Sequence, residues 1–354
     1  MEFIKKRRLA WLGILLAFSL VAAACGDDDD DSTGGDSGGD TTEAGADVSG
    51  SINISGSSTV EPISSLAAEA FTGENSGVDI AVDGPGTGDG FELFCNGETD
   101  ISDASRTIDE EEAAACQTNG IEYTELQVGY DGMSVLTNAN NADAPECLSF
   151  ADLYALIGPE SEGFDNWSDA QAIATELGST TQFPDAPLEL TGPGTESGTY
   201  DSFIEIALSG IAEERGVPED QIETTRPDYA SSADDNVIIQ NIEASDTSLG
   251  WVGFAFAEEA GDQVTEIPVS AEPGDAASCV EPTAETIADT SDAGYPLSRP
   301  LFIYVSTAAA EENAAVVPFV DFYLDGLNQF VEEGGYVTMP DDQVQLTVTD
   351  WEGR

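Results

Sequence analysis

The sequence predicts an α/β fold built from two lobes, and two observations support this prediction. Short apolar strands alternate with helix-like stretches from Ile52 onward, a rhythm typical of parallel sheets covered by helices. The roughly 305 residues that show this rhythm are too many for one compact core and suit two lobes of ordinary domain size. The first 47 residues stand apart in composition.

The first part of the pattern alternates strands and helices from Ser51 to about residue 137. Strands are expected at 51–55, 78–83, near 101, 122–128 and 133–137. Helices are expected from Ser57-Ser58-Thr59 to Phe71, at 88–96 and at 110–117. The three hydroxyls that precede the first helix are suited to cap it.

The second part continues the alternation to the end of the chain. Helices are expected at 150–157, 199–215, 236–243 and 314–329, and strands at 189–191, 249–254, 264–269 and 301–306. The helix at 199–215 is amphipathic, because Phe203, Ile206, Ala207 and Ile211 fall on one face. We expect that face to pack against the core.

The N-terminal segment resembles an export signal followed by a tether. Lys5, Lys6, Arg7 and Arg8 precede an apolar stretch, and three alanines lead to Cys25. Cleavage before Cys25 would match the bacterial lipobox, in which that cysteine receives a lipid; the alternative is ordinary cleavage with an unmodified cysteine. We place the signal peptide at 1–24 and an acidic, disordered tether at 25–47, which has too few apolar residues to fold.

The chain is strongly acidic. It has 70 acidic residues against nine basic ones, and the net charge is −61. Four of the basic residues lie in the first eight, and the other five are arginines. Such a charge repels nucleic acid and anionic lipid, so neither is expected as a partner. We interpret the acidity as an adaptation to salty surroundings, where the Debye length is short.

The cysteines and the absence of histidine further restrict the function. Four cysteines remain after Cys25, an even number that suits disulfides in an oxidising compartment. Cys95 and Cys116 lie in consecutive helices and are expected to pair, which leaves Cys147 to pair with Cys279. Without histidine, Ser-His-Asp triads and the commonest metal ligand are excluded, so we expect neither an enzyme nor a metal site.

Three loops of small polar residues stand immediately before expected helices. They are Gly56-Ser57-Ser58-Thr59-Val60, Gly84-Pro85-Gly86-Thr87-Gly88 and Gly194-Thr195-Glu196-Ser197-Gly198-Thr199. Backbone N–H groups at helix starts and neutral hydroxyls together can bind an oxyanion without much formal charge. Each loop alone is more simply a helix cap, but three on one chain indicate a binding site.

Five segments, in order along the chain, resemble the phosphate-binding lipoproteins of high-affinity phosphate ABC importers. The segments are GSSTVEPI (56–63), GTGDGFELFCNGETDISDASRTI (86–108), GPGTESGTYDSF (192–203), DDNVIIQNIEASDTSLGWVGFAF (234–256) and YPLSRPLFIYV (295–305). The resemblance implies a type II periplasmic-binding-protein fold with phosphate in the cleft between the lobes. We place lobe 1 at 48–130 and 254–354, and lobe 2 at 131–253.

The resemblance also implies which residues bind phosphate. Donors are expected from the first loop, the second loop, the segment around the Ser-Arg pair and the Ser-Gly-Thr helix start. These residues are Ser58, Thr59, Val60, Thr87, Ser105, Arg106, Ser197, Gly198 and Thr199. Arg106 would supply the charged donor, and its alternative is a surface ion pair. Arg299 is interpreted as structural, because it precedes Pro300 beside a core strand.

Two positions depart from the pattern of well-known family members. Pro193 stands where those members have an arginine shortly before Ser-Gly-Thr, so the charge has to come from elsewhere. Ser105 stands where they have an aspartate that accepts the proton on phosphate, a basis for excluding sulfate. Asp131 and Asp103 are the candidate substitutes.

The predicted function is therefore capture of inorganic phosphate and its delivery to an ABC importer. The chain is expected to be a monomer without a cofactor, anchored by lipid to the outer face of the cytoplasmic membrane or periplasmic, with the permease subunits as partners. The alternatives are a receptor for sulfate or another oxyanion, and a phosphatase that uses carboxylates without histidine.

Overall fold

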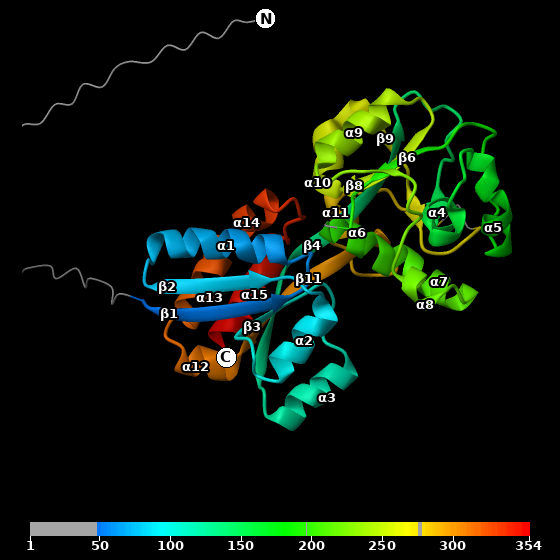
Figure 1. Cartoon of the computed structure of the whole chain (residues 1–354). Coiled ribbons are helices and arrows are strands. Elements are labelled where there is room, and N and C mark those ends of the chain that lie inside the picture. The colour runs from blue at the N-terminus through cyan, green and yellow to red at the C-terminus, as the bar shows by residue number, and fades with distance from the viewer. Residues whose placement is uncertain (1–47, 196, 275–277) are drawn as a thin grey trace, which may run out of the picture. The chain divides into compact units, whose positions relative to one another are not determined.

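The computed structural model describes residues 48–195, 197–274 and 278–354 and confirms the α/β class with two lobes (Figure 1). In the described residues one sheet has the strand order β2-β1-β3-β11-β4-β8-β6-β7, with β9 added beside β4. The signal peptide, Cys25 and the tether at 25–47 lie outside the described residues.

The first lobe begins with parallel pairing of β1 (Gly50–Gly56) with β2 (Val78–Asp83) and β3 (Ile101–Ala104). Helix α1 (Glu61–Glu74) lies between β1 and β2 in the chain and buries Ile63, Ala67 and Phe71. The remaining helices of this lobe are α2 (Thr87–Cys95), α3 (Glu110–Asn119), α12 (Thr307–Glu312), α13 (Val316–Asp325), α14 (Leu327–Glu333) and α15 (Asp341–Glu352).

Strand β4 (Tyr123–Asn138) is continuous where the sequence predicted two strands. Its first part pairs antiparallel with β11 (Ser298–Ser306), and its second part, from Met133, pairs with β8 (Ser248–Gly253). The residues between the predicted strands are buried and extended, so no turn forms there. β4 therefore passes from one lobe into the other.

The second lobe is built around β8. Strand β6 (Glu189–Gly192) pairs parallel with β8 and with β7 (Ala230–Ser231), and β9 (Val264–Glu266) pairs antiparallel with β4. A small separate sheet joins β5 (Leu148–Ser149) to β10 (Val269–Ser270). The helices are α4 (Phe150–Ile157), α5 (Gln171–Glu176), α6 (Gly198–Phe203), α7 (Ser209–Arg215), α8 (Glu219–Ile222), α9 (Asp235–Ala244), α10 (Phe254–Ala260) and α11 (Ala284–Ile287).

Strand pairing places residues 264–270 beside strands of the second lobe, whereas the sequence analysis placed residues from 254 onward in lobe 1. β9 pairs with β4 and β10 with β5, and the chain next pairs with a first-lobe strand only in β11. The strand predicted at 264–269 forms β9 and the start of β10, and both pair with strands of the second lobe. We therefore place the return crossing within β11.

Both disulfides have the pairing predicted from the sequence. Cys95 is joined to Cys116, which links α2 to α3, and Cys147 is joined to Cys279 across 132 residues of chain. The second bridge ties the start of the second lobe to the segment after β10. It therefore supports the assignment of residues 254–279 to this lobe.

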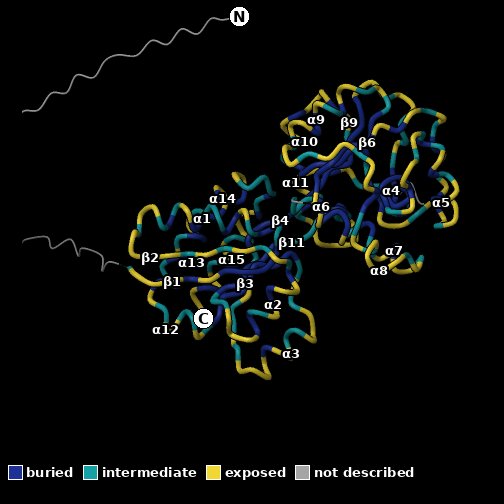
Figure 2. Tube along the Cα trace, viewed as in Figure 1, coloured by how far each residue is buried: buried dark blue, intermediate teal, exposed yellow. Residues whose placement is uncertain are grey.

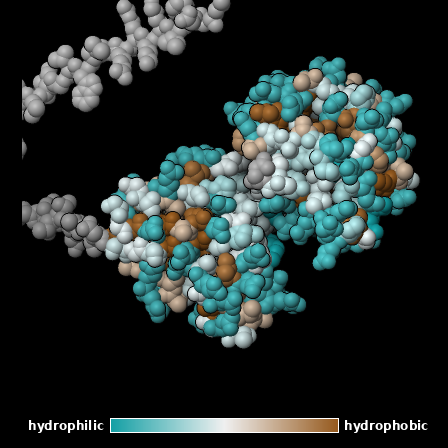
Figure 3. Space-filling view, viewed as in Figure 1, coloured by the Kyte–Doolittle hydropathy of each residue, from teal (hydrophilic) through white to brown (hydrophobic). Residues whose placement is uncertain are grey.

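The central strands β3 and β8 and most of β4 are buried, whereas the edge strands β2 and β7 and the outer turns of the helices are largely exposed (Figure 2). Hydrophilic residues dominate the face shown in Figure 3, as the composition requires. No helix within the described ranges has the length and apolar character needed to cross a membrane.

Candidate functional site

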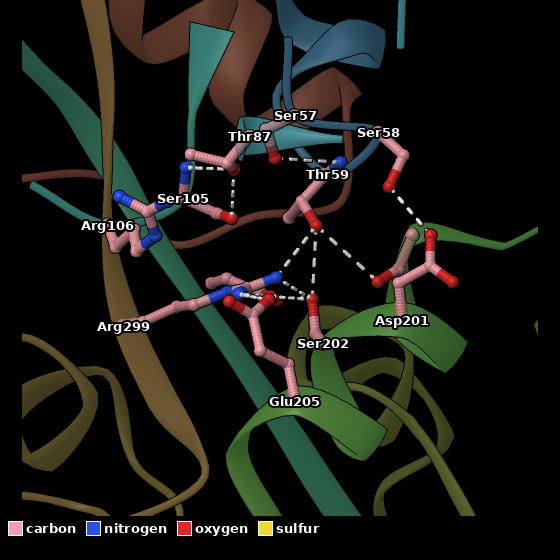
Figure 4. Close-up of polar contacts among 12 residues, drawn as sticks. Ser57, Ser58, Thr59, Thr87, Ser105, Arg106, Asp201, Ser202, Glu205 and Arg299 are labelled. Carbon is pink, nitrogen blue, oxygen red and sulfur yellow. Dashed lines mark hydrogen bonds and ion pairs between the residues drawn. The ribbon is translucent and has the colours of Figure 1, made fainter. Parts of the chain in front are cut away.

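In the first loop, between β1 and α1, the hydroxyls of Ser58 and Thr59 contact the second lobe and do not cap α1. The N-cap of α1 is Val60, which makes no side-chain cap, and Pro62 lies in the first turn. Ser58 Oγ donates to Asp201 Oδ2 at 2.8 Å, and Thr59 Oγ1 lies 3.1 Å from Ser202 Oγ (Figure 4). The predicted hydroxyl caps are therefore wrong, and these hydroxyls connect the two lobes.

The backbone around this loop is held by close packing. The Ser57 N–H donates to the carbonyl of Asp103 at 2.8 Å. Gly56 has a φ of +155°, and a Cβ there would lie 2.0 Å from that carbonyl oxygen. A Cβ on Gly90 of α2 would lie 2.3 Å from Gly56 Cα. Only glycine fits at these two positions, which brings the first and second loops together.

The second loop places Thr87 beside Ser105. The two hydroxyl oxygens are 3.0 Å apart, and the Ser105 N–H donates to Thr87 Oγ1 at 3.3 Å. Thr87 is the first residue of α2, and Ser105 follows β3 directly. Two neutral hydroxyls are thus fixed at the start of α2 and just after the end of β3.

The third loop acts mainly as a helix cap. Ser197 is the N-cap of α6, and its Oγ accepts the Thr199 N–H at 3.2 Å. A Cβ on Gly198 would lie 3.0 Å from Thr59 Cα, so this glycine packs against the first loop. Thr59 Oγ1 also donates to the Gly198 carbonyl at 3.5 Å. This loop joins the lobes, but its described residues, 194, 195 and 197–199, do not line the cavity.

Arg299, which was interpreted as structural, lies beside the first loop. It lies on β11, and its side chain is only 10% exposed. Its Nη2 donates to Thr59 Oγ1 at 3.0 Å and to Ser202 Oγ at 2.6 Å, and Nη1 donates to Glu205 Oε2 at 2.5 Å (Figure 4). One guanidinium therefore contacts both lobes.

Arg106 is directed elsewhere. It makes a bidentate ion pair with Glu112 of α3, at 2.8 and 2.7 Å, and its guanidinium lies 5.6 Å from the ring centroid of Phe91. The side chain is 36% exposed and does not line the cavity. Glu112 raises the pKa of Arg106, as expected for a charge-assisted pair. The surface ion pair considered as the alternative is thus the arrangement that the structure contains.

The two predicted proton acceptors are buried behind the cavity wall. Burial raises the pKa of Asp103 to about 7, although Ser64 donates to its Oδ1 at 2.9 Å. Burial also raises the pKa of Asp131, while the nearby Arg299 and a hydrogen bond from Ser202 at 2.6 Å oppose that shift. Neither carboxylate lines the cavity.

A cavity of about 290 Å³ lies where these loops meet. Its lining includes Ser58, Thr59, Thr87 and Ser105, four of the predicted binding residues. Val60, Arg106, Asp131 and the Ser-Gly-Thr segment at 197–199 are not part of that lining. The lining residues that the sequence analysis did not select are Ser57, Pro85, Gly86, Asp201, Ile204, Glu205, Ser209, Glu223 and Arg299.

Two signals in the sequence point to the residues that were missed. Asp201 and Glu205 are four residues apart on the helix that follows Ser-Gly-Thr, so they lie on one face. Arg299 is one of five arginines after residue 8 and lies in a matched segment, as Arg106 does. Sequence alone could not rank the two arginines, because their partners come from distant parts of the chain.

The cavity combines hydroxyl groups and one guanidinium with three carboxylates. Hydroxyls can donate or accept, an arginine presents a charged fork, and a carboxylate can only accept while it is ionised. Burial raises the pKa of Asp201, whereas the hydrogen bond from Ser58 and the charge of Arg299 oppose that shift. Such a site suits a small oxyanion that carries a proton. In the described ranges no cluster of three or more Asp, Glu, Cys or His side chains could hold a metal ion.

Comparisons with known proteins extend over nearly the whole chain. The sequence profile of the PBP superfamily domain matches residues 41–326. Protein SphX of Synechocystis sp. is 36% identical over 85% of this chain and 82% of that protein. Phosphate-binding protein PstS of Staphylococcus aureus is 30% identical over 95% of this chain and 89% of that protein.

A solved structure is also similar. It is described as a possible phosphate binding protein from Planctomyces limnophilus, and it superposes with a TM-score of 0.74 at 35% identity. The superposition covers 86% of this chain and 99% of that one. Residues 41–326, which the superfamily profile matches, include every residue that lines the cavity.

Proposed function

Since this chain belongs to the PBP superfamily and, within it, to the family of the phosphate-binding protein PstS, we propose that it captures inorganic phosphate outside the cytoplasm for an ABC importer. The observation that carries the proposal is the cavity in which hydroxyls of the first lobe face Arg299 and α6. A phosphate bound there would contact both lobes. Its capture would therefore stabilise the arrangement in which the lobes meet.

We assign the charged donor to Arg299 in place of Arg106. Arg299 is mostly buried and contacts Thr59 and Ser202, whereas Arg106 is neutralised by Glu112 outside the cavity. A dianion that leaves water loses much hydration, and neutral donors offset only part of that cost. One guanidinium in reach supplies a charge-assisted hydrogen bond that hydroxyls cannot match.

We assign the acceptor for the phosphate proton to Asp201 in place of Asp131 or Asp103. Asp201 lines the cavity, and Ser58 holds one of its oxygens. An ionised carboxylate can accept a hydrogen bond from hydrogen phosphate, but it repels sulfate, which carries no proton at neutral pH. Asp201 would therefore be the residue that favours phosphate over sulfate.

Calorimetric titration of the purified chain with phosphate and with sulfate tests this function. We expect saturable, one-to-one binding of phosphate and much weaker binding of sulfate. In Asp201→Asn the preference for phosphate over sulfate should shrink by about tenfold or more, because an amide can donate to sulfate. Tighter binding of sulfate than of phosphate by the wild type would favour the alternative receptor and contradict the proposal.

We also propose that the protein binds without turnover and is held at the membrane by a lipid on Cys25. The absence of histidine throughout the chain argues against a phosphatase, and a p-nitrophenyl phosphate assay should detect no hydrolysis.

The basic start, the apolar stretch and the alanines before Cys25 support lipidation, and a monomer is expected. Intact mass of the exported chain should show an acylated Cys25, and an unmodified mature N-terminus would contradict the anchor.

A further inference from the structure

Two carboxylates flank Arg299, and they differ in how deeply they are buried. Asp131 lies opposite Arg299 in the β4–β11 register, its side chain is 2% exposed, and its Oδ2 is 3.6 Å from Arg299 Nε. Glu205 reaches Arg299 from the second lobe, and its side chain is 51% exposed. Asp131 is therefore a fixed counter-ion, whereas Glu205 can turn into solvent at small cost.

Glu205 lies in a π-helical turn, residues 204–208, inserted between α6 and α7. Such turns are rare and frequently occur at functional sites. Asp201, one turn earlier, makes a similar contact with Ser58 on the first lobe. This segment of the second lobe thus presents two carboxylates to donors that line the cavity, Asp201 to Ser58 and Glu205 to Arg299.

We propose that Glu205 is a resident counter-ion, which occupies the Arg299 guanidinium in the ligand-free protein and leaves it when phosphate binds. This inference rests on the proposed function, because it assumes that Arg299 binds the oxyanion. Nη2 is held by the hydroxyls of Thr59 and Ser202, and Nε faces the buried Asp131. Nη1, held by the half-exposed Glu205, is the donor whose partner a ligand can replace.

Phosphate and the Glu205 carboxylate cannot share Nη1 without like-charge repulsion. Each binding event therefore includes the loss of the Arg299–Glu205 pair, and this loss weakens the observed affinity. When phosphate leaves, Glu205 can return to Arg299, so the buried guanidinium is not left without a partner on that side. The pair would thus set the affinity and favour release.

The test compares phosphate titrations of the full chain as wild type, Glu205→Gln and Glu214→Gln. Glu205→Gln should bind phosphate about fivefold more tightly, because a partly exposed ion pair contributes about 1 kcal/mol. Glu214 is exposed on α7 and does not line the cavity, so Glu214→Gln removes the same charge from the same lobe. Its dissociation constant should stay within about twofold of the wild type.

Several outcomes distinguish this inference from the proposed function. If the wild type binds phosphate and Glu205→Gln binds it no more tightly, the inference alone is overturned. Equal tightening in Glu205→Gln and Glu214→Gln would assign the effect to long-range charge and would also overturn it. A wild type that does not bind phosphate would overturn the proposed function. Glu205→Ala provides a second variant, and thermal unfolding verifies that each variant is folded.

Discussion

Two regions of this molecule contain the same pair of residue types, an aspartate and an arginine, in opposite arrangements. At the end of β3, Asp103 is buried and Arg106, three residues later, points away to Glu112. At the β4–β11 crossing, Asp131 and Arg299 lie opposite each other in register and remain together. In the first region the aspartate and the arginine lie apart, whereas in the second they lie side by side and are both mostly buried.

This difference is the reason why we propose Arg299 as the arginine that binds the ligand. Glu112 reaches Arg106 with both carboxylate oxygens and also accepts the Asp109 N–H of the capping box, so the pair is part of the start of α3. Among the described residues, the exposed partner of Arg299 is the half-exposed Glu205, which contacts it through one carboxylate oxygen. The Arg106 guanidinium is therefore held by the start of α3. The Arg299 guanidinium lies where the chain crosses between the lobes, and a ligand can replace its exposed partner.

The largest expected effect is on phosphate affinity when Arg299 is removed. Arg299→Ala should weaken phosphate binding by about 30-fold or more, since loss of one partner of a buried charge pair costs roughly 2–5 kcal/mol. Arg299→Lys should recover little, because lysine cannot present a planar fork to Thr59, Ser202 and the ligand. Calorimetric titration measures both variants. Near-normal affinity in Arg299→Ala would show that the crossing does not supply the charged donor.

An intermediate effect is expected on stability at Asp103, which has no cationic partner of the kind that Asp131 has. Burial raises its pKa to about 7 in the folded chain, against about 4 when unfolded. Between these pH values the folded chain holds a proton that the unfolded chain has released, so this group makes stability fall as pH rises. Asp103→Asn should remove that contribution and raise the melting temperature by several degrees at pH 8.

The matched control for Asp103→Asn is Asp131→Asn. The charge of Asp131 is offset by Arg299. Removing the Asp131 carboxylate leaves a buried guanidinium without that partner, so the melting temperature should not rise comparably. Melting curves of the wild type and both variants at pH 5 and pH 8 make the comparison. Equal stabilisation of the chain by both substitutions at pH 8 would contradict the idea that Arg299 offsets the charge of Asp131.

The smallest effect is expected for Arg106. Arg106→Ala removes the pair with Glu112 and the contact with the Phe91 ring, so stability should fall by about 1 kcal/mol, the upper range for a partly exposed pair. Phosphate affinity should change by less than about threefold, because Arg106 does not line the cavity. Denaturant unfolding and titration of the same variant separate the two readouts. A loss of phosphate affinity as large as that of Arg299→Ala would show that Arg106 takes part in phosphate binding.

Local patterns in the sequence predicted most elements and half of the cavity's first-lobe wall. Strands β1 and β2 and helices α2, α4 and α9 lie within a residue or two of the predicted bounds, because periodicity and turn residues are local properties. Thr87 and Ser105 were found because they lie in quoted motifs. The helix predicted at 199–215 contains a π turn, which no periodicity indicated.

The sequence by itself determined the α/β class, the two disulfide pairs and the absence of histidine chemistry, since each follows from residue types and their spacing. Only the tertiary structure decided the continuity of β4, the pairing of β9 and β10 with strands of the second lobe, and the partners of Arg299 and Arg106. These depend on contacts between residues far apart in the chain, such as Arg299 with Thr59 and Glu205. The partner of an arginine depends on which residues pack around it in the folded chain, and a short segment of sequence does not determine that packing.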